Sequence, residues 1–225
     1  MKILASADIH GERASLQWLV ETAIQVKPEA IILAGDLLGS PVEYSDVRQA
    51  QLVDAERTVD ILMGADRPIL YIMGNDDLVP LTPRSDHLRS LQGKRISLGK
   101  YNFVGYQYSL PFMGGIYEKP EEDIEQDLLE LEPLVDGDTV LVTHSPAYGI
   151  LDLGIMDRHA GSKSLLNLIK RAQPRAHVHG HIHREFGRFG IHFNVASDMR
   201  KRAVLIDLDS LKHSYLEDSM NQTGT

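Results

Sequence analysis

Five short apolar runs constrain the fold of this chain most. They are rich in isoleucine, leucine and valine, and polar residues do not alternate with the apolar ones. Strands covered on both faces have this pattern, whereas a strand with one wet face alternates. The runs are residues 2–7 (KILASA), 30–35 (AIILAG), 68–74 (PILYIMG), 139–144 (TVLVTH) and 175–180 (RAHVHG).

Segments with helical periodicity separate several of these runs. Residues 13–27, 46–63 and 163–172 carry apolar side chains at helical spacing. Ser162 is the expected N-cap of the last of them. Alternating β and α units predict right-handed crossovers and a largely parallel sheet. In the second helix the expected buried stripe is Leu52, Ala55, Val59 and Leu62.

The other segments complete the expected architecture. Residues 120–134 predict an acidic helix whose apolar edge is Ile124, Leu128 and Leu131. Beyond Arg184, short apolar runs joined by turns predict an antiparallel meander, and residues 96–107 have the same character. We expect two sheets with helices outside them. Residues 1–208 are predicted to form a single domain, followed by a loosely held polar tail at residues 209–225.

Composition excludes several kinds of site. The chain contains no cysteine, so disulfides, thiolate zinc sites and cysteine nucleophiles are excluded. A net charge of −9 disfavours a long nucleic acid as partner. No apolar run approaches the length of a leader or a membrane span, so we expect a cytoplasmic protein without a membrane partner. The sequence leaves an oligomer open.

Polar side chains follow every one of the five apolar runs. The carboxyl ends of strands line the crevice where an open α/β sheet binds its ligands. In DIH and HIH, an extended chain would place both polar side chains on one side and the isoleucine on the other. Alone, each residue is typical of a turn, a helix cap or an ordinary histidine; together they predict a site. They are Asp8, His10, Asp36, Asn75, His144, His181 and His183.

This set of donors favours a metal centre. Seven nitrogen and oxygen ligands are too many for one tetrahedral zinc, but they suit two ions that share a carboxylate. Ligands without sulfur that mix imidazole, carboxylate and amide favour two divalent ions of Mn, Fe, Zn, Ni or Co, with Mn preferred, over Ca or Mg. Four of the histidines outside the set are expected to be ordinary core or surface residues: His87, His177, His192 and His213.

The motifs as a whole resemble the calcineurin-like metallophosphoesterase family. The matching stretches are DIH, GDLL, GNDD, THS and GHIH, which span residues 8–183. The resemblance implies an α/β fold, a four-layer α/β/β/α sandwich with two central mixed sheets flanked by helices. It also implies a dinuclear centre in which a hydroxide between the ions attacks phosphorus.

By the same resemblance, Asp8, His10 and His183 would bind one metal. Asn75, His144 and His181 would bind the other, and Asp36 would bridge them. The chain looks closest to the small single-domain members, several of which act on phosphodiesters, including cyclic nucleotides. The resemblance therefore implies a phosphodiesterase whose substrate is a small phosphate ester. The alternatives are a phosphomonoesterase and a weakly catalytic scaffold that binds protein partners.

One departure from the family pattern bears on the chemistry. The usual histidine of Gly-Asn-His-Asp/Glu is replaced by Asp76, while Asp77 keeps the place of the acidic residue that supports the site. Two dications would lower the pKa of Asp76, which predicts a carboxylate that cannot donate a proton. Either the substrate has a leaving group that needs little protonation, or His159 supplies the proton. Arg158 and Ser162, beside a helix N-terminus, are candidate phosphate contacts.

Overall fold

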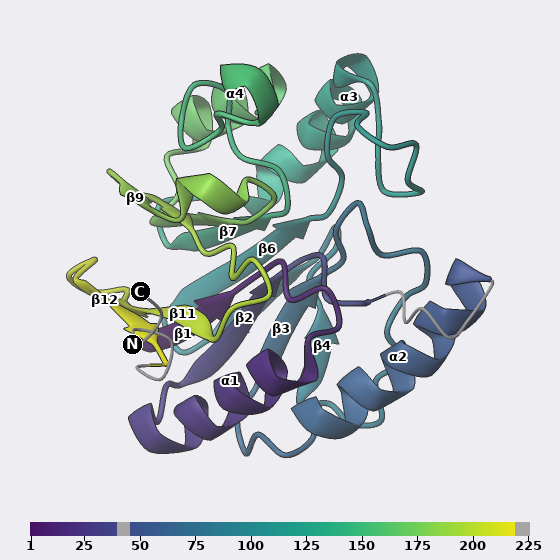
Figure 1. Ribbon diagram of the computed structural model, residues 1–225. Coiled ribbons are helices and arrows are strands. Elements are labelled where there is room, and N and C mark those ends of the chain that lie inside the picture. Colours follow the sequence, from purple (N-terminus) through teal and green to yellow (C-terminus); the bar gives the residue numbers. More distant parts are fainter. Residues whose placement is uncertain (40–45, 219–225) are drawn as a thin grey trace, which may run out of the picture.

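The computed structural model describes residues 1–39 and 46–218, which form two six-stranded sheets (Figure 1). In spatial order, the first sheet comprises β12 (His213–Glu217), β11 (Arg202–Asp207), β1 (Lys2–Ser6), β2 (Ala30–Ala34), β3 (Ile69–Ile72) and β4 (Leu88–Ser90). The second comprises β5 (Arg95–Leu98), β6 (Tyr101–Tyr106), β7 (Thr139–Thr143), β8 (Ala176–His179), β10 (His192–Asn194) and β9 (Gly187–Phe189). Four strands from β1 to β4 are parallel, as are β6, β7, β8 and β10.

Helices cover the outer faces of both sheets, which gives four layers. Figure 1 shows α1 (Arg13–Val26) and α2 (Val47–Leu62) below the first sheet, and α3 (Glu121–Leu131) and α4 (Lys163–Ala172) above the second. Three short 3-10 helices lie in the connections: η1 (Glu132–Leu134), η2 (Ile155–Asp157) and η3 (His183–Glu185). The predicted four-layer α/β/β/α sandwich is confirmed.

Both faces of the central strands are buried, which explains why their sequences do not alternate. Ile32 of β2 packs between the two sheets with Phe103 and Val140 of the second sheet. Its neighbours Ile31 and Leu33 point the other way, into the layer formed with α1 and α2. Each of these side chains is fully buried, worth roughly 1.5–3 kcal/mol of transfer free energy. The apolar runs are thus continuous because alternate residues serve two different cores.

Local sequence sets the helix ends as expected. Asp46 accepts hydrogen bonds from the backbone N–H groups of Arg48 and Gln49 and starts α2. Ser162 accepts one from the N–H of Leu165 and starts α4 at the predicted residue. On α3 the buried residues are the three that were predicted, Ile124, Leu128 and Leu131.

The predicted stripe of α2 is wrong at one position. Leu52 is 46% exposed, whereas the polar residues Gln51 and Asp54 are buried. Both polar side chains hydrogen-bond the backbone of loops that follow strands: Gln51 Nε2 donates to the carbonyl of Asp76, and Asp54 accepts from the N–H of Gly39. Polar residues therefore occupy part of the helix face that hydropathy alone assigns to apolar ones.

Two expectations for the C-terminal third are also wrong. The stretch after Arg184 is not one meander, because β10 pairs parallel to β8 in the second sheet while β11 pairs antiparallel to β1 in the first. The predicted tail begins too early, because β12 lies within it and pairs antiparallel to β11. The rest of that tail, residues 219–225, lies outside the described residues. The expected strands at residues 96–107 are confirmed as the β5–β6 hairpin.

Candidate metal centre

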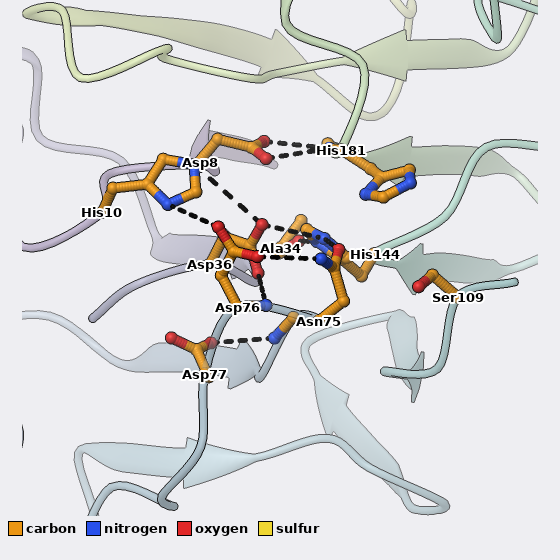
Figure 2. Close-up of polar contacts among 12 residues, drawn as sticks. Asp8, His10, Ala34, Asp36, Asn75, Asp76, Asp77, Ser109, His144 and His181 are labelled. Atoms are coloured by element: carbon orange, nitrogen blue, oxygen red, sulfur yellow. Dashed lines mark hydrogen bonds and ion pairs between the residues drawn. The ribbon is translucent and has the colours of Figure 1, made fainter. Parts of the chain in front are cut away.

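The seven predicted ligands gather where the carboxyl ends of strands from both sheets meet, and Figure 2 labels all of them except His183. Strands β1, β2 and β3 of the first sheet lead into the segments with the aspartates, His10 and Asn75. Strands β7 and β8 of the second lead into the segments with His144, His181 and His183. The crevice therefore lies between two sheets, rather than along the edge of a single open sheet as the strand-end argument supposed.

The chain does not reach this crevice in an extended conformation. Asp8, His10, Asp36 and His181 all have positive φ, between 48° and 70°. Non-glycine residues seldom adopt this conformation, which costs of order 1–3 kcal/mol and persists where the surroundings enforce it, often at functional sites. The extended geometry predicted for DIH and HIH is therefore wrong. The side chains converge because the backbone turns sharply after each strand.

The side chains form two clusters. Within each cluster, the ligand atoms of the aspartate and the two histidines all lie within 4.8 Å of one another. Asp8, His10 and His183 form the first. Asp36, His144 and His181 form the second, and Asn75 Oδ1 joins it at 2.9 Å from His144 Nε2. Asp36 Oδ2 lies 3.3 Å from His144 Nε2 and 4.0 Å from His10 Nε2, so its carboxylate stands between the clusters.

A backbone carbonyl of β2 holds His144 in the orientation that a metal ligand needs. Its Nδ1 lies 2.9 Å from the carbonyl oxygen of Ala34, which can only accept, so Nδ1 carries a proton and donates it. Nε2 then faces the oxygens of Asp36 and Asn75. Burial alone would lower the pKa of His144, but the Asp36 carboxylate outweighs burial and raises it to about 10. The crevice thus favours positive charge at this point.

His10 and His183 show the same arrangement. His10 Nδ1 lies 3.4 Å from Asp76 Oδ2, and His183 Nδ1 lies 3.0 Å from Asp198 Oδ1. Their Nε2 atoms face each other at 3.3 Å, and Asp8 Oδ1 is 3.3 Å from His183 Nε2. With each Nδ1 proton directed at a carboxylate, two imidazole lone pairs and a carboxylate oxygen converge on one point. A cation suits that point, so these residues fit a metal ion.

The other charged groups of the crevice respond to the same crowding. Burial opposes ionisation of Asp36, but His144 holds its pKa below the usual range. The pKa of His181 falls to about 4 because of burial and of His144 nearby. A hydrogen bond with Asp8 raises the pKa of His183. Asp36 and His181 thus stay in their ligand forms, carboxylate and neutral imidazole, near neutral pH.

Asp76 lies at the rim of the centre and contacts two of the candidate ligands. Its Oδ1 accepts a hydrogen bond of 3.0 Å from Asn75 Nδ2, which turns the amide oxygen of Asn75 toward His144. Its Oδ2 faces His10. Burial and the Asp36 carboxylate raise the pKa of Asp76 in the protein itself. The lowered pKa predicted from the sequence counted two bound dications and concerns the loaded centre.

Asp77 ties together the two loops that carry Asp36 and Asn75. It is fully buried, and it accepts backbone N–H bonds of 3.0, 2.8 and 2.8 Å from Leu37, Leu38 and Gly74. Burial and the Asp36 carboxylate raise its pKa to about 7. The predicted support from Asp77 thus has a geometric basis in these three bonds.

Two glycines let the backbone approach the carboxylates this closely. A Cβ on Gly74 would lie 2.2 Å from Asp36 Oδ1, and one on Gly180 would lie 2.3 Å from Asp8 Oδ2. No side chain fits at either place without moving a candidate ligand.

The other predicted site residues lie in the loop between β7 and α4. His159 Nδ1 is 2.7 Å from Asp152 Oδ1, and the buried Asp152 also accepts the N–H groups of Gly149 and Gly161. His159 is thus oriented by a fixed carboxylate and half exposed, with a side-chain exposure of 43%. Arg158 is exposed in the same loop.

The predicted phosphate contact of Ser162 is wrong. The side chain is buried, and its hydroxyl donates to Glu121 Oε1 at 2.9 Å while accepting the N–H of Leu165. Its hydrogen bonds hold α4 to α3, so it serves as the helix cap that the sequence also predicted.

Two histidines set aside as ordinary form a buried chain of hydrogen bonds. Thr143 Oγ1 donates to the carbonyl of Ser145, so it accepts from His177 Nε2 at 2.8 Å. His177 Nδ1 then accepts from His192 Nδ1 at 2.9 Å. Burial lowers the pKa of His177 well below its usual value and that of His192 to about 4. Both are neutral core residues, as predicted.

The family model of calcineurin-like phosphoesterases matches residues 1–185, most of the chain. The chain belongs to the calcineurin-like phosphoesterase family. This family match confirms the resemblance of the motifs, and the two clusters of ligand atoms are the part of the molecule that suits the divalent metals its members bind.

Among the relatives of this phosphoesterase chain, sequence similarity covers only part of each protein. Human metallophosphoesterase domain-containing protein 1 is 34% identical over 100 residues, 43% of this chain and 30% of the relative. The UPF0046 protein K07C11.7 of Caenorhabditis elegans is 34% identical over 98 residues, 43% of this chain and 32% of the relative. The matched region thus spans about a third of the length of these curated relatives.

Solved structures show the same fold over nearly the whole chain. The protein TT1561 of Thermus thermophilus superposes with a TM-score of 0.74 at 19% identity, covering 96% of this chain and 98% of that one. A dimetal phosphatase from Danio rerio superposes with a TM-score of 0.59 at 12% identity, covering 97% of this chain and 99% of that one.

Across residues 1–39 and 46–218, no helix is long and apolar enough to cross a membrane.

Proposed function

We propose that this calcineurin-like phosphoesterase is a phosphodiesterase that depends on two divalent metal ions, with Mn favoured. The position of Asp36 carries the proposal. Its carboxylate stands between two clusters of ligand atoms, as a bridging ligand of a dinuclear centre would. Two ions bound there would supply Lewis-acid activation of a phosphoryl group and of an attacking water.

The residues of the chain have distinct roles in this proposal. Asp8, His10 and His183 would hold one ion, and Asn75, His144 and His181 the other. Three of the histidines are fixed for this role, because an oxygen acceptor faces the Nδ1 of each while Nε2 faces the crevice.

Asp76 supports a preference for diesters over monoesters. A carboxylate in place of a neutral imidazole lowers the charge of the crevice by one unit. A diester carries one negative charge and a monoester approaches two, so the added carboxylate repels the monoester more. Asp76 contacts Asn75 and His10, so we assign it to the orientation of ligands rather than to proton donation.

A proton for the leaving oxygen would then come from elsewhere or be unnecessary. His159 is a candidate donor, because Asp152 accepts from its Nδ1 and would stabilise the charged imidazole. A His159→Ala variant should lose activity on diesters with poor leaving groups and keep it on aryl diesters. An equal rate on both kinds would remove His159 from the mechanism.

The experiment that tests the function is a panel of substrates and metals. The protein should be assayed with a monoester, an acyclic diester such as bis-p-nitrophenyl phosphate, and a cyclic nucleotide, each with Mn, Ni, Co, Zn and Fe. We expect turnover of diesters, fastest with Mn. Faster monoester turnover would show a phosphomonoesterase, and no turnover with any ion would favour a scaffold that binds protein partners.

A further inference from the structure

Two loops beside the candidate centre expose large apolar side chains. In the loop after β6, Phe112 is 59% exposed, Met113 75% and Ile116 57%. In the loop after β7, Ile155 is 68% exposed and Met156 74%. We call these five residues the apolar rim. Single exposed apolar residues are common, but five in two loops at one edge of a sheet suggest a binding surface.

The apolar rim borders the centre. Strands β6 and β7 are parallel neighbours, so their following loops leave the second sheet at the edge where His144 lies. The ring of Phe112 meets the candidate ligand His181 edge to face, with centroids 6.2 Å apart. A Cβ on Gly115 would lie 2.4 Å from the carbonyl oxygen of Asn75, so this loop packs directly on the backbone of another candidate ligand.

The second loop reaches the same segment of chain from its other end. Arg184 Nε donates to the carbonyl of Leu153 at 2.6 Å, and Arg184 also pairs with Asp157 at 2.7 Å. Both loops therefore contact the stretch from His181 to Arg184. A ligand whose phosphate lies at the centre would have apolar side chains within reach of its ester arms.

Backbone contacts fix the turns that carry these side chains. Glu118 accepts backbone N–H bonds from Phe112, Met113 and Gly114 at 2.8–2.9 Å, which fixes the first loop as a tight turn. Met156 has a φ of 57°, a conformation that non-glycine residues adopt at a cost of order 1–3 kcal/mol. The backbone that presents the apolar side chains is thus set before a ligand arrives.

We infer that the apolar rim binds one apolar ester arm of the substrate, so that the centre selects phosphodiesters with an aromatic or alkyl substituent. This inference rests on the proposed function, because the phosphate must lie at the centre for the arm to reach the rim. The arm that stays on phosphorus is the informative one, because changing it leaves the leaving group unchanged.

The test compares two phosphinates, dimethylphosphinate and methyl(2-naphthyl)phosphinate, which carry one negative charge as a diester does and which the centre cannot hydrolyse because both substituents are joined to phosphorus by P–C bonds. Their dissociation constants are measured by calorimetry with Mn-loaded protein. We expect the naphthyl compound to bind about threefold to tenfold tighter, the range for one good aromatic contact. Phe112→Ser should remove most of that difference. Equal binding of the two compounds would overturn the inference.

A matched control separates the rim from general apolar binding. Phe189 is 65% exposed, a fraction similar to the 59% of Phe112. It pairs with His192 at the amino end of β10, so it lies at the end of the second sheet opposite the candidate centre. Phe189→Ser should keep the full preference. Loss of the preference in both variants would show non-specific apolar binding and overturn the inference.

Kinetics with one leaving group provide the second measurement. p-Nitrophenyl methyl phosphate and p-nitrophenyl phenyl phosphate release the same phenolate, so they differ only in the arm that stays on phosphorus. We expect a lower KM for the phenyl compound, and we expect this difference in KM to disappear in Phe112→Ser. If neither diester turns over, the proposed function fails; if both turn over with equal KM, only the inference fails. If the two free diesters have equal KM and a long-chain alkyl diester is preferred only when it is embedded in phosphatidylcholine vesicles, the apolar rim binds a lipid surface and the inference is overturned.

Discussion

Replacing Asp76 by alanine tests how this centre works without the usual histidine. The change removes the acceptor of the Asn75 amide at 3.0 Å and the carboxylate that faces His10 at 3.4 Å. It leaves the backbone N–H of residue 76 free to donate to Asp36 at 2.9 Å, because that bond involves no side-chain atom of residue 76. The loop should keep its place while two ligands lose their orientation.

The expected loss can be placed on a scale. Removing a residue that orients a metal ligand costs about 10–100-fold in metal affinity, or about 1.4–2.7 kcal/mol. Only the Asn75 contact lies within ordinary hydrogen-bond distance, so we expect the loss for one such contact and not the product of two. Asp76→Asn keeps one acceptor oxygen and should lose less.

Calorimetric titration with Mn²⁺ measures this loss directly. The control is Asp60→Ala, which removes an exposed aspartate on α2 that pairs with Arg84 rather than with a candidate ligand. The reasoning is refuted if Asp76→Ala binds Mn²⁺ as tightly as the parent and loses rate only on diesters with poor leaving groups. That result would make Asp76 a proton donor.

Two further predictions follow from the contacts of the histidines. Asp198→Ala removes the acceptor of His183 Nδ1 and should weaken Mn²⁺ binding about 10–100-fold. Arg200→Ala removes the arginine that also pairs with Asp198 and should leave Mn²⁺ binding unchanged. Equal losses of affinity in the two variants, measured by calorimetry, would contradict the role given to Asp198. Burial lowers the pKa of His179 to about 3 and of His192 to about 4, so the unfolded chain takes up protons first as pH falls below about 6.5. The free energy of unfolding from urea denaturation should fall by roughly 1.4 kcal/mol per pH unit for each between about pH 6 and 4.5, and His192→Gln should show a shallower slope; an unchanged slope would exclude His192.

Much of the candidate site could be predicted because its ligands follow strands directly. The apolar runs that end at Asp8, Asp36 and His144 are local features, and strand ends of a layered α/β fold meet at one edge. The path of the chain after each strand could not be predicted, because a pattern of polar and apolar residues does not identify residues with positive φ such as Asp8 and His10.

The supporting residues could not be predicted for a different reason. Asp198 and Gln51 act through contacts with other loops, and Asp152 acts through contacts within its own loop. Each of the three alone is typical of a loop or a helix surface. A buried polar face on α2 offers one weak signal, because Gln51 and Asp54 lie three residues apart. The predicted meander is wrong because strand pairing across two sheets depends on tertiary packing, which short apolar runs do not reveal.

The number of metal ions bound per chain tests the central claim most directly. Equilibrium dialysis against Mn²⁺, followed by elemental analysis, counts them. The account predicts two ions for the parent chain and a loss of tight binding at both positions in Asp36→Ala, since Asp36 stands between the clusters. One ion or none in the parent chain, or two tightly bound ions in Asp36→Ala, would contradict it.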